Sequence, residues 1–191
     1  MFDVVILAAG RASRFGSPKQ LAEYNGKPLL QIAIDLCLGK HIKPLVSLGA
    51  YFEEIVGCES LKLDECSIIR IKNWSKGLSF SIAESIEKVQ GCSSNKGVLF
   101  LLADQPMIRG SDFDLLSEAI SNNPEAIVCA KYSDSVGVPA YFPETCFEQL
   151  KNIQGDRGAK AVIERFEHIA VLLNGPLIDI DTVEDIERAP F

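Results

Sequence analysis

The sequence predicts an α/β fold in a single domain, residues 1–191, with a mainly parallel sheet of about seven strands. Short apolar runs alternate with helical patterns along the chain, which is typical of a sheet covered by helices. The first apolar run, Val4 to Ala8, ends abruptly in a glycine-bearing loop. Hydrophobic residues make up 47% of the chain and charged residues 24%, so the chain can bury a core.

The expected elements follow from these patterns, and no linker, repeat or low-complexity segment divides them. Strands are expected at residues 4–8, 44–48, 68–71, 98–102, 126–130, 138–142 and 169–173. Helices are expected at residues 28–38, 79–90, 112–122, 145–152, 158–166 and 183–188, with a short helix around 52–56. The strand at 138–142 follows a polar loop, and it is the one expected to run antiparallel.

Three helix starts carry recognisable signals. Pro28 suits the first turn of its helix, because a backbone N–H is not needed there. Ser111-Asp112-Phe113-Asp114 resembles a capping box, and Thr182-Val183-Glu184-Asp185 repeats that signal before the last helix.

Composition excludes several classes of partner. A net charge of −7 argues against nucleic acid, and no apolar run approaches the ~20 residues that a membrane helix needs. The N-terminus holds Asp3 and no basic stretch, so it does not resemble a signal peptide. The 6 cysteines form no Cys-x-x-Cys pair, and neither of the 2 histidines lies near a cysteine, which argues against structural zinc. We expect reduced thiols and a cytoplasmic protein.

The loop after the first strand is locally cationic. Arg11, Arg14, Lys19 and Lys27 stand against the single acid Glu23 in a chain that is acidic as a whole. A basic loop at the carboxyl end of a strand is where α/β folds hold phosphorylated ligands. A solvated basic turn is the alternative interpretation.

Two common phosphate-binding motifs do not fit this loop. Gly10 and Gly16 are separated by five residues, whereas the P-loop requires four and then a lysine directly after the second glycine. The dinucleotide fingerprint requires Gly-x-Gly, but Gly10 is followed by Arg11-Ala12, and the second strand ends at Leu48-Gly49 without an acid.

Two acidic segments follow strand-like patterns. The apolar run 98–102 leads to Asp104-Gln105-Pro106, which places a carboxylate at the ligand-binding edge of the sheet unless Asp104 merely starts a turn. Near the end of the chain, strand alternation would put Asp179 and Asp181 on one face. Alternatively, Asp181 or Thr182 caps the last helix.

Three further segments have weaker signals for ligand binding. The segment from Asn73 to Ser81 opens a helix whose N–H groups face the sheet edge, and Gly155-Asp156-Arg157-Gly158 precedes another helix. Either could contact a phosphate, and either could be an ordinary helix start, with Trp74 packed into the core. The third segment, Ser135 to Phe142, contains Gly137-Val138-Pro139 at the start of an expected strand.

These segments, which run from residue 4 to residue 185, occur in the same order in the MobA-like NTP transferase family. The chain resembles this family, and its molybdenum cofactor cytidylyltransferase branch in particular. Leu7-Ala8-Ala9-Gly10-x-x-x-Arg14-Phe15-Gly16-x-x-Lys19 resembles the signature loop of the family. Asp104-Gln105-Pro106 resembles its Gly-Asp-Gln-Pro motif, and residues 179–185 resemble its closing Asp-Ile-Asp-Thr-Pro-Glu-Asp.

The resemblance implies a three-layer α/β/α Rossmann-like nucleotidyltransferase fold and Mg²⁺-dependent transfer of CMP from CTP to molybdopterin, with release of pyrophosphate. Arg14, Lys19 and Asp104 would be catalytic, and Asp104 and Asp181 would bind Mg²⁺. The nucleotide would meet residues Leu7, Ala8, Ala9, Gly10, Arg14, Lys19 and Ser79. The acceptor would meet Gly137, Pro139, Gly155 and Asp156. A molybdenum hydroxylase apoenzyme would be a possible protein partner.

Departures from the family pattern keep two alternatives open. Ala103 stands where the family has glycine, Val138 where related enzymes have histidine, and Lys160 where the family has arginine. Ala12 and Phe15 replace serine and methionine. One alternative is a nucleotidyltransferase with another acceptor, such as a sugar phosphate. The other is a non-catalytic accessory protein that binds a nucleotide or cofactor for a molybdenum enzyme.

Overall fold

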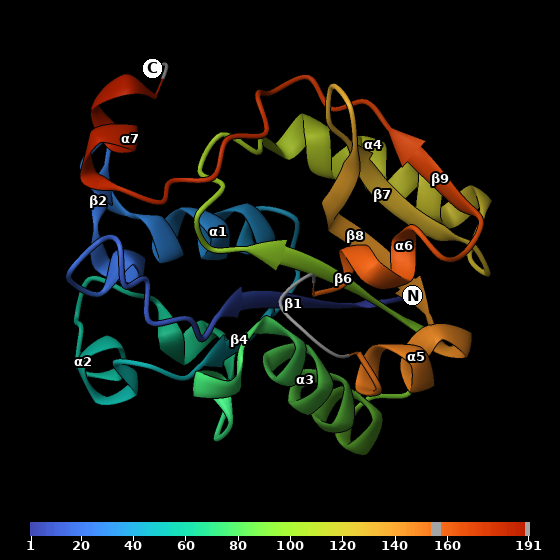
Figure 1. Ribbon diagram of the computed structural model, residues 1–191, viewed down its shortest axis with the longest axis horizontal. Coiled ribbons are helices and arrows are strands. Elements are labelled where there is room, and N and C mark those ends of the chain that lie inside the picture. Colours follow the sequence, from blue (N-terminus) through green and yellow to red (C-terminus); the bar gives the residue numbers. More distant parts are fainter. Residues whose placement is uncertain (154–157, 190–191) are drawn as a thin grey trace.

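A seven-stranded sheet forms the centre of the molecule, as the computed structural model shows for residues 1–153 and 158–189 (Figure 1). Its order is β5-β4-β1-β6-β8-β7-β9. The strands are β1 (Asp3–Ala8), β4 (Leu45–Leu48), β5 (Ser67–Arg70), β6 (Gly97–Leu102), β7 (Ile127–Lys131), β8 (Val136–Pro143) and β9 (His168–Val171). All of them pair in parallel except β8, which runs antiparallel to β6 and β7. Each of the seven predicted strands is therefore confirmed, including the antiparallel one.

Helices cover both faces of this sheet, which gives the predicted three-layer α/β/α fold (Figure 1). They are α1 (Leu29–Leu38), α2 (Phe52–Val56), α3 (Leu78–Cys92), α4 (Gly110–Asn122), α5 (Phe147–Lys151), α6 (Lys160–Ile163) and α7 (Val183–Arg188). Single 3₁₀ turns lie at η1 (Lys19–Leu21), η2 (Leu63–Glu65), η3 (Trp74–Lys76) and η4 (Glu144–Cys146), and β2 (Glu23–Tyr24) pairs with β3 (Lys27–Pro28).

Two apolar cores, one on each face, hold the layers together. α1 and α4 pack on one face, whereas α3, α5 and α6 pack on the other. Val4 and Ile6 of β1 point into the first core, and Val5 and Leu7 point into the second. Burial on both faces explains why this strand is a continuous apolar run rather than an alternating one.

Several predicted boundaries were wrong. The helix expected at 158–166 is only the four-residue α6, and α1 begins after Pro28 rather than at it. α4 begins at Gly110, because the carboxylate of Asp112 accepts a hydrogen bond from the backbone N–H of Arg109 at 2.9 Å.

The C-terminal segment, residues 172–182, contains neither helix nor strand. The strand alternation expected for Asp179 and Asp181 was therefore wrong. The buried Asp112 holds the start of the segment, since it accepts from the N–H of Asn174 at 2.6 Å. The capping box at Thr182 is confirmed by reciprocal hydrogen bonds with Asp185.

Within residues 1–153 and 158–189, no helix combines the length and the apolar character required to cross a membrane.

Candidate active site

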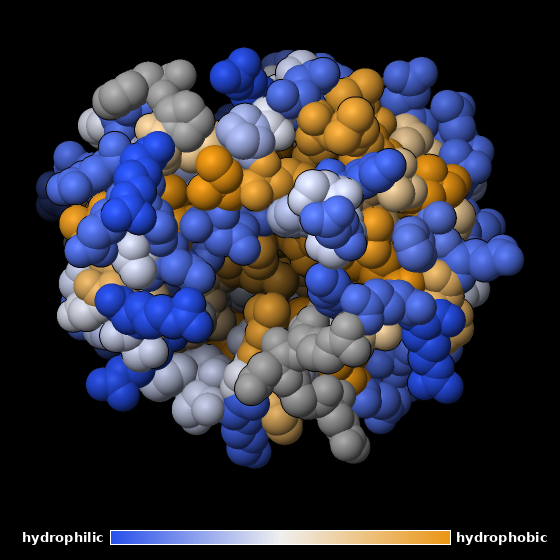
Figure 2. Space-filling view, turned by 45° about the horizontal axis from the view of Figure 1, so that its top comes forward, coloured by the Kyte–Doolittle hydropathy of each residue, from blue (hydrophilic) through white to orange (hydrophobic). Residues whose placement is uncertain are grey.

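A cavity of about 580 Å³ lies at the carboxyl ends of β1 and β6. Its walls come from the loop at residues 7–13, the segment 74–81 at the start of α3, and the strand end at 102–104, together with Lys19 and Gln20. The molecular surface is hollowed at the centre of the face in Figure 2, where hydrophobic residues form the floor and hydrophilic residues the rim. The cavity therefore has an apolar floor beside a charged corner.

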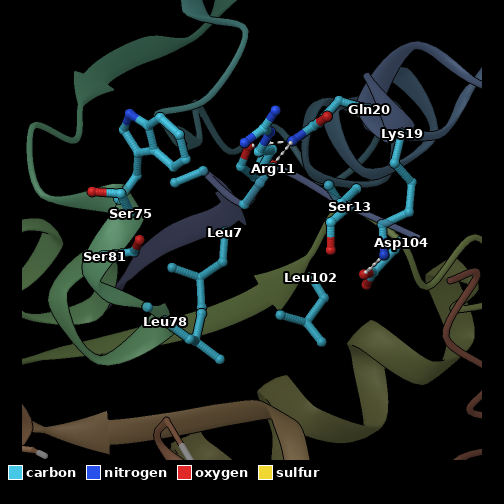
Figure 3. Close-up of a pocket in the computed structure, with 17 residues that line it drawn as sticks. Leu7, Arg11, Ser13, Lys19, Gln20, Ser75, Leu78, Ser81, Leu102 and Asp104 are labelled. Atoms are coloured by element: carbon cyan, nitrogen blue, oxygen red, sulfur yellow. Dashed lines mark hydrogen bonds and ion pairs between the residues drawn. The ribbon is translucent and has the colours of Figure 1, made fainter. Parts of the chain in front are cut away.

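Lys19 and Asp104 line the charged corner, and Asp181, which does not line the cavity, contacts the same lysine from outside it. Lys19 Nζ lies 2.5 Å from Asp104 Oδ2 and 3.0 Å from Asp181 Oδ1 (Figure 3 shows the Lys19–Asp104 pair). The side chains of Lys19 and Asp104 are only 14% and 22% exposed. Arg14 reaches Asp181 at 3.4 Å, but its side chain is 77% exposed, and such surface pairs contribute about 1 kcal/mol or less. The buried ammonium is thus the main link between the two carboxylates.

The ionisation of Lys19 is set by competing effects. Burial disfavours its charge, but the charge of Asp104 and hydrogen bonds to Asp104 and Asp181 outweigh burial and raise the pKa of Lys19. The side chain therefore carries a full positive charge at neutral pH, as a phosphate-binding group requires.

The carboxylates of Asp104 and Asp181 suit a divalent cation. Asp104 Oδ1 is buried and, among the described residues, has no hydrogen-bond partner, so it offers a lone pair to a cation. Both carboxylates contact the same ammonium, and carboxylate oxygens are the ligands that Mg²⁺ and Mn²⁺ prefer. No group of three or more His, Cys, Asp or Glu in the described part of the chain is placed to hold a metal. Phosphate oxygens and water would have to complete the coordination.

Gln20 holds the loop that follows β1. Its side-chain amide donates to the carbonyl of Ala8 at 2.7 Å and to that of Gly10 at 3.0 Å, and it is 5% exposed. A Cβ at Gly10 would meet no atom within 4 Å, so the backbone there borders open space that a ligand can enter. The sequence analysis missed Gln20, because both of its partners are backbone carbonyls.

Trp74 lines the cavity and packs on Gly49, beside the loop that follows β1. A Cβ at Gly49 would lie 2.5 Å from Trp74 Cβ and 2.7 Å from the carbonyl oxygen of Ala9, closer than atoms pack. Glycine at this position therefore lets Trp74 and the loop approach each other.

We expect Gly49→Ala to lower the free energy of unfolding by about 1–3 kcal/mol, because the added methyl group must push Trp74 or the loop aside. Urea denaturation of the wild type and the variant measures the loss. Gly91→Ala is the matched control, since a Cβ there meets nothing within 4 Å and alanine favours the helix. Equal stability of the two variants would contradict this account of Gly49.

Glu84 of α3 binds Lys72 and Asn73, the two residues before Trp74, through hydrogen bonds. Its carboxylate accepts from the N–H groups of Lys72 at 2.8 Å and Asn73 at 2.9 Å, and from the Asn73 side-chain amide at 2.9 Å. Burial opposes the charge of Glu84, but these hydrogen bonds outweigh it and lower the pKa of the carboxyl.

Because the pKa of Glu84 is lower in the folded state, this carboxylate stabilises the fold above its ordinary pKa of 4.5 and loses that effect as the pH falls below it. We expect Glu84→Gln to cost about 1 kcal/mol of unfolding free energy at pH 7, and less at about pH 3.5. Urea denaturation at both pH values tests this, with the exposed Glu118→Gln as control. A loss independent of pH would show that the charge of Glu84 is unimportant.

Only some of the residues predicted to bind the nucleotide line the cavity. Leu7, Ala8, Ala9 and Gly10 line the cavity, as Lys19 and Asp104 do. Arg14 does not line it and pairs with Asp181 instead. Ser79 is 2% exposed and also does not line it, whereas its neighbours Leu78 and Ser81 do.

The predicted acceptor residues are only partly described. Gly137 and Pro139 lie on β8 and do not line the cavity, but the carbonyl of Val138 between them accepts hydrogen bonds from Gln105 and Tyr132. Gly155 and Asp156 lie outside the described residues.

Known proteins similar to this chain share its sequence pattern and its fold. Residues 4–170 match the MobA-like NTP transferase domain. The chain is 25% identical to the purine catabolism protein PucB of Bacillus subtilis, over 96% of the chain and 93% of PucB. It is also 25% identical to a probable molybdenum cofactor guanylyltransferase of a Geobacillus species, over 86% of the chain and 82% of that protein.

Solved structures agree with the fold. Rv0371c from Mycobacterium tuberculosis superposes with a TM-score of 0.85 at 24% identity, covering 98% of this chain and 97% of that one. A manganese complex of the same mycobacterial protein gives a TM-score of 0.81 at 23% identity, with 98% and 96% covered. Since the domain match spans most of the sequence, the chain belongs to the MobA-like NTP transferase family.

Proposed function

We propose that this protein transfers CMP from CTP to the terminal phosphate of a molybdopterin cofactor, with Mg²⁺ and with release of pyrophosphate. The observation that carries the proposal is the partly buried Lys19 ammonium, which contacts two carboxylates at one corner of a cavity walled by residues 7–13. A cation, paired acids and open backbone together are what a triphosphate and its metal ion require.

Each residue has a distinct task in this mechanism. The backbone at Gly10 approaches the nucleotide, and Lys19 neutralises charge on the α-phosphate as an acceptor phosphate attacks in line. Arg14, exposed beside the site, contacts the outgoing pyrophosphate. Asp104 and Asp181 would hold the Mg²⁺, which supplies charge neutralisation to the phosphates when bound.

No side chain is needed as a general base, because a phosphate nucleophile is already ionised at neutral pH. This agrees with the cavity wall, which contains no histidine among its described residues. Positioning and electrostatic stabilisation are the expected sources of rate enhancement.

Two observations favour CTP as the donor. Ala9 lies where the cytidylyl branch has alanine, and one similar structure, a CMP:2-keto-3-deoxy-manno-octonic acid synthetase with a TM-score of 0.68, is a complex with CTP. The relative named a guanylyltransferase and the one named for purine catabolism keep GTP and other acceptors as alternatives. Ala103 lines the cavity and adds a methyl group there, which keeps the accessory role as a further alternative.

Pyrophosphate release tests the proposal. The protein is incubated with Mg²⁺, with CTP, GTP, ATP or UTP in turn, and with molybdenum-loaded molybdopterin, alongside controls without acceptor. We expect release with CTP that depends on the cofactor. Release with another nucleotide or with a sugar phosphate would identify a different donor or acceptor. Nucleotide binding without any release would favour the accessory role.

A further inference from the structure

Gln105 joins three parts of the site through one buried amide. Its side chain is 5% exposed, and Nε2 lies 2.7 Å from Asp179 Oδ1, 2.8 Å from the Tyr132 hydroxyl and 3.3 Å from the carbonyl oxygen of Val138. The Tyr132 hydroxyl also donates to Val138 at 2.6 Å. Because Gln105 directly follows Asp104, this network begins at a proposed metal ligand.

Within the part of the chain that the structure describes, two hydrogen bonds join Asp104 and Gln105 to the C-terminal segment, and the bond to Asp179 is one of them. The other is the N–H of Ile180, which donates to the carbonyl of Asp104 at 2.9 Å. The Ile180 side chain is fully buried. Asp181 comes next in the chain and turns its carboxylate to Lys19. The position of Asp181 thus depends on how residues 179 and 180 are held on one side, and on the other side on Asp185, whose Oδ2 accepts from the N–H of Asp181 at 3.0 Å.

No helix or strand in residues 172–182 holds Asp181 in place. No ladder of hydrogen bonds in this segment therefore fixes the distance between Asp104 and Asp181. Side chains that orient metal ligands in this way commonly change metal affinity 10–100-fold when replaced.

We propose that Gln105 is a positioning residue: through Asp179 it sets the place of Asp181 relative to Asp104, and so sets the affinity of the site for a divalent cation in the nucleotide complex. This inference rests on the proposed metal-binding role of the two aspartates. It adds that the amide donor of Gln105, which touches no reacting group, determines metal affinity.

An amide exchange tests the proposal. Gln105→Glu keeps the shape of the side chain but removes the amide donor and sets a second carboxyl group against Asp179. In the double variant Gln105→Glu, Asp179→Asn, the amide donor belongs to residue 179 and the carboxylate acceptor to residue 105, so the same contact is restored in the opposite direction. The measured quantity is the dissociation constant of Mn²⁺ with saturating CTP, from the electron paramagnetic resonance signal of free Mn²⁺, corrected for Mn²⁺ held by CTP alone.

We expect Gln105→Glu to weaken Mn²⁺ binding about 10-fold, and the double variant to bind Mn²⁺ more tightly than Gln105→Glu does. Gln90→Glu, on the exposed side of α3, adds the same charge elsewhere and should leave the affinity unchanged. If Gln105→Glu does not fold, Gln105→Met removes the donor without adding charge and should also weaken binding.

The outcomes separate this inference from the proposed function. Wild-type affinity in the folded Gln105 variants, or a double variant no better than Gln105→Glu, overturns the positioning role alone. Wild-type protein that binds no Mn²⁺ with CTP, GTP, ATP or UTP overturns the metal site and this inference together, whereas Mn²⁺ binding with a nucleotide other than CTP changes only the donor. A different acceptor leaves the result unaffected, because no acceptor is present.

Discussion

Asp104→Asn is expected to reduce nucleotide transfer by at least about 100-fold while the fold remains intact. The substitution keeps the size of the side chain but removes the charge that faces Lys19 and the lone pair left free on Oδ1. A loss of this size is typical when one oriented group is removed from an electrostatic site. The rate of pyrophosphate release at saturating CTP, with Mg²⁺ varied, measures it.

A surface aspartate provides the control for this variant. Asp114 pairs with Lys40 at 2.6 Å, and its side chain is 64% exposed. We expect Asp114→Asn to retain full activity. Circular dichroism should show the native fold in both variants, since neither carboxylate takes part in the hydrogen bonds of the sheet. Substantial activity in folded Asp104→Asn would show that the metal ligand has been assigned to the wrong residue.

Lys19→Met is expected to have two opposite effects. Transfer should fall about 100-fold or more, because no other described cation lines the corner beside Asp104 in place of this ammonium. Binding of Mn²⁺ without nucleotide should become several-fold tighter, because the carboxylates of Asp104 and Asp181 lose the positive charge that now neutralises them.

Both effects can be measured on the same preparation. Pyrophosphate release reports the first, and titration with Mn²⁺ in the absence of CTP reports the second. Lys27→Met is the matched control, since Lys27 pairs with Asp35 and its side chain is 59% exposed. If Lys19→Met binds Mn²⁺ less tightly than the wild type, the ammonium does not compete with the metal for these carboxylates.

The sheet could be predicted from sequence because its strands are buried on both faces. Two of the strands are unbroken apolar runs, Val4 to Ala8 and Val98 to Leu102. Such a run is typical of a central strand that helices cover on both faces. The C-terminal segment could not be predicted in the same way. Residues 177–181 alternate like a strand, but Gln105 donates to the Asp179 carboxylate and the N–H of Ile180 donates to the Asp104 carbonyl. Such long-range contacts leave no local pattern.

The charged residues of the candidate site could be predicted because their side chains carry the charge that the proposed chemistry needs. Lys19 and Asp104 meet as their motifs suggest, and Asp181 joins them. Gln20 escaped prediction because it binds backbone carbonyls, and a single polar residue in a loop has no periodicity to reveal it. Ser79 differs from these residues, since the side chain of this serine is turned into the interior and does not line the cavity.

The irregular path of residues 172–182 also bears on how the molecule opens. This segment joins β9 at the edge of the sheet to α7 beside β2 (Figure 1), and it supplies Asp181. A stretch without its own hydrogen-bond ladder can detach at a lower free energy than the sheet needs to unfold. Under mild denaturant, the protein should therefore pass through a state with an intact sheet and an incomplete metal site. During refolding, the ability to bind a metal should return after the secondary structure has formed.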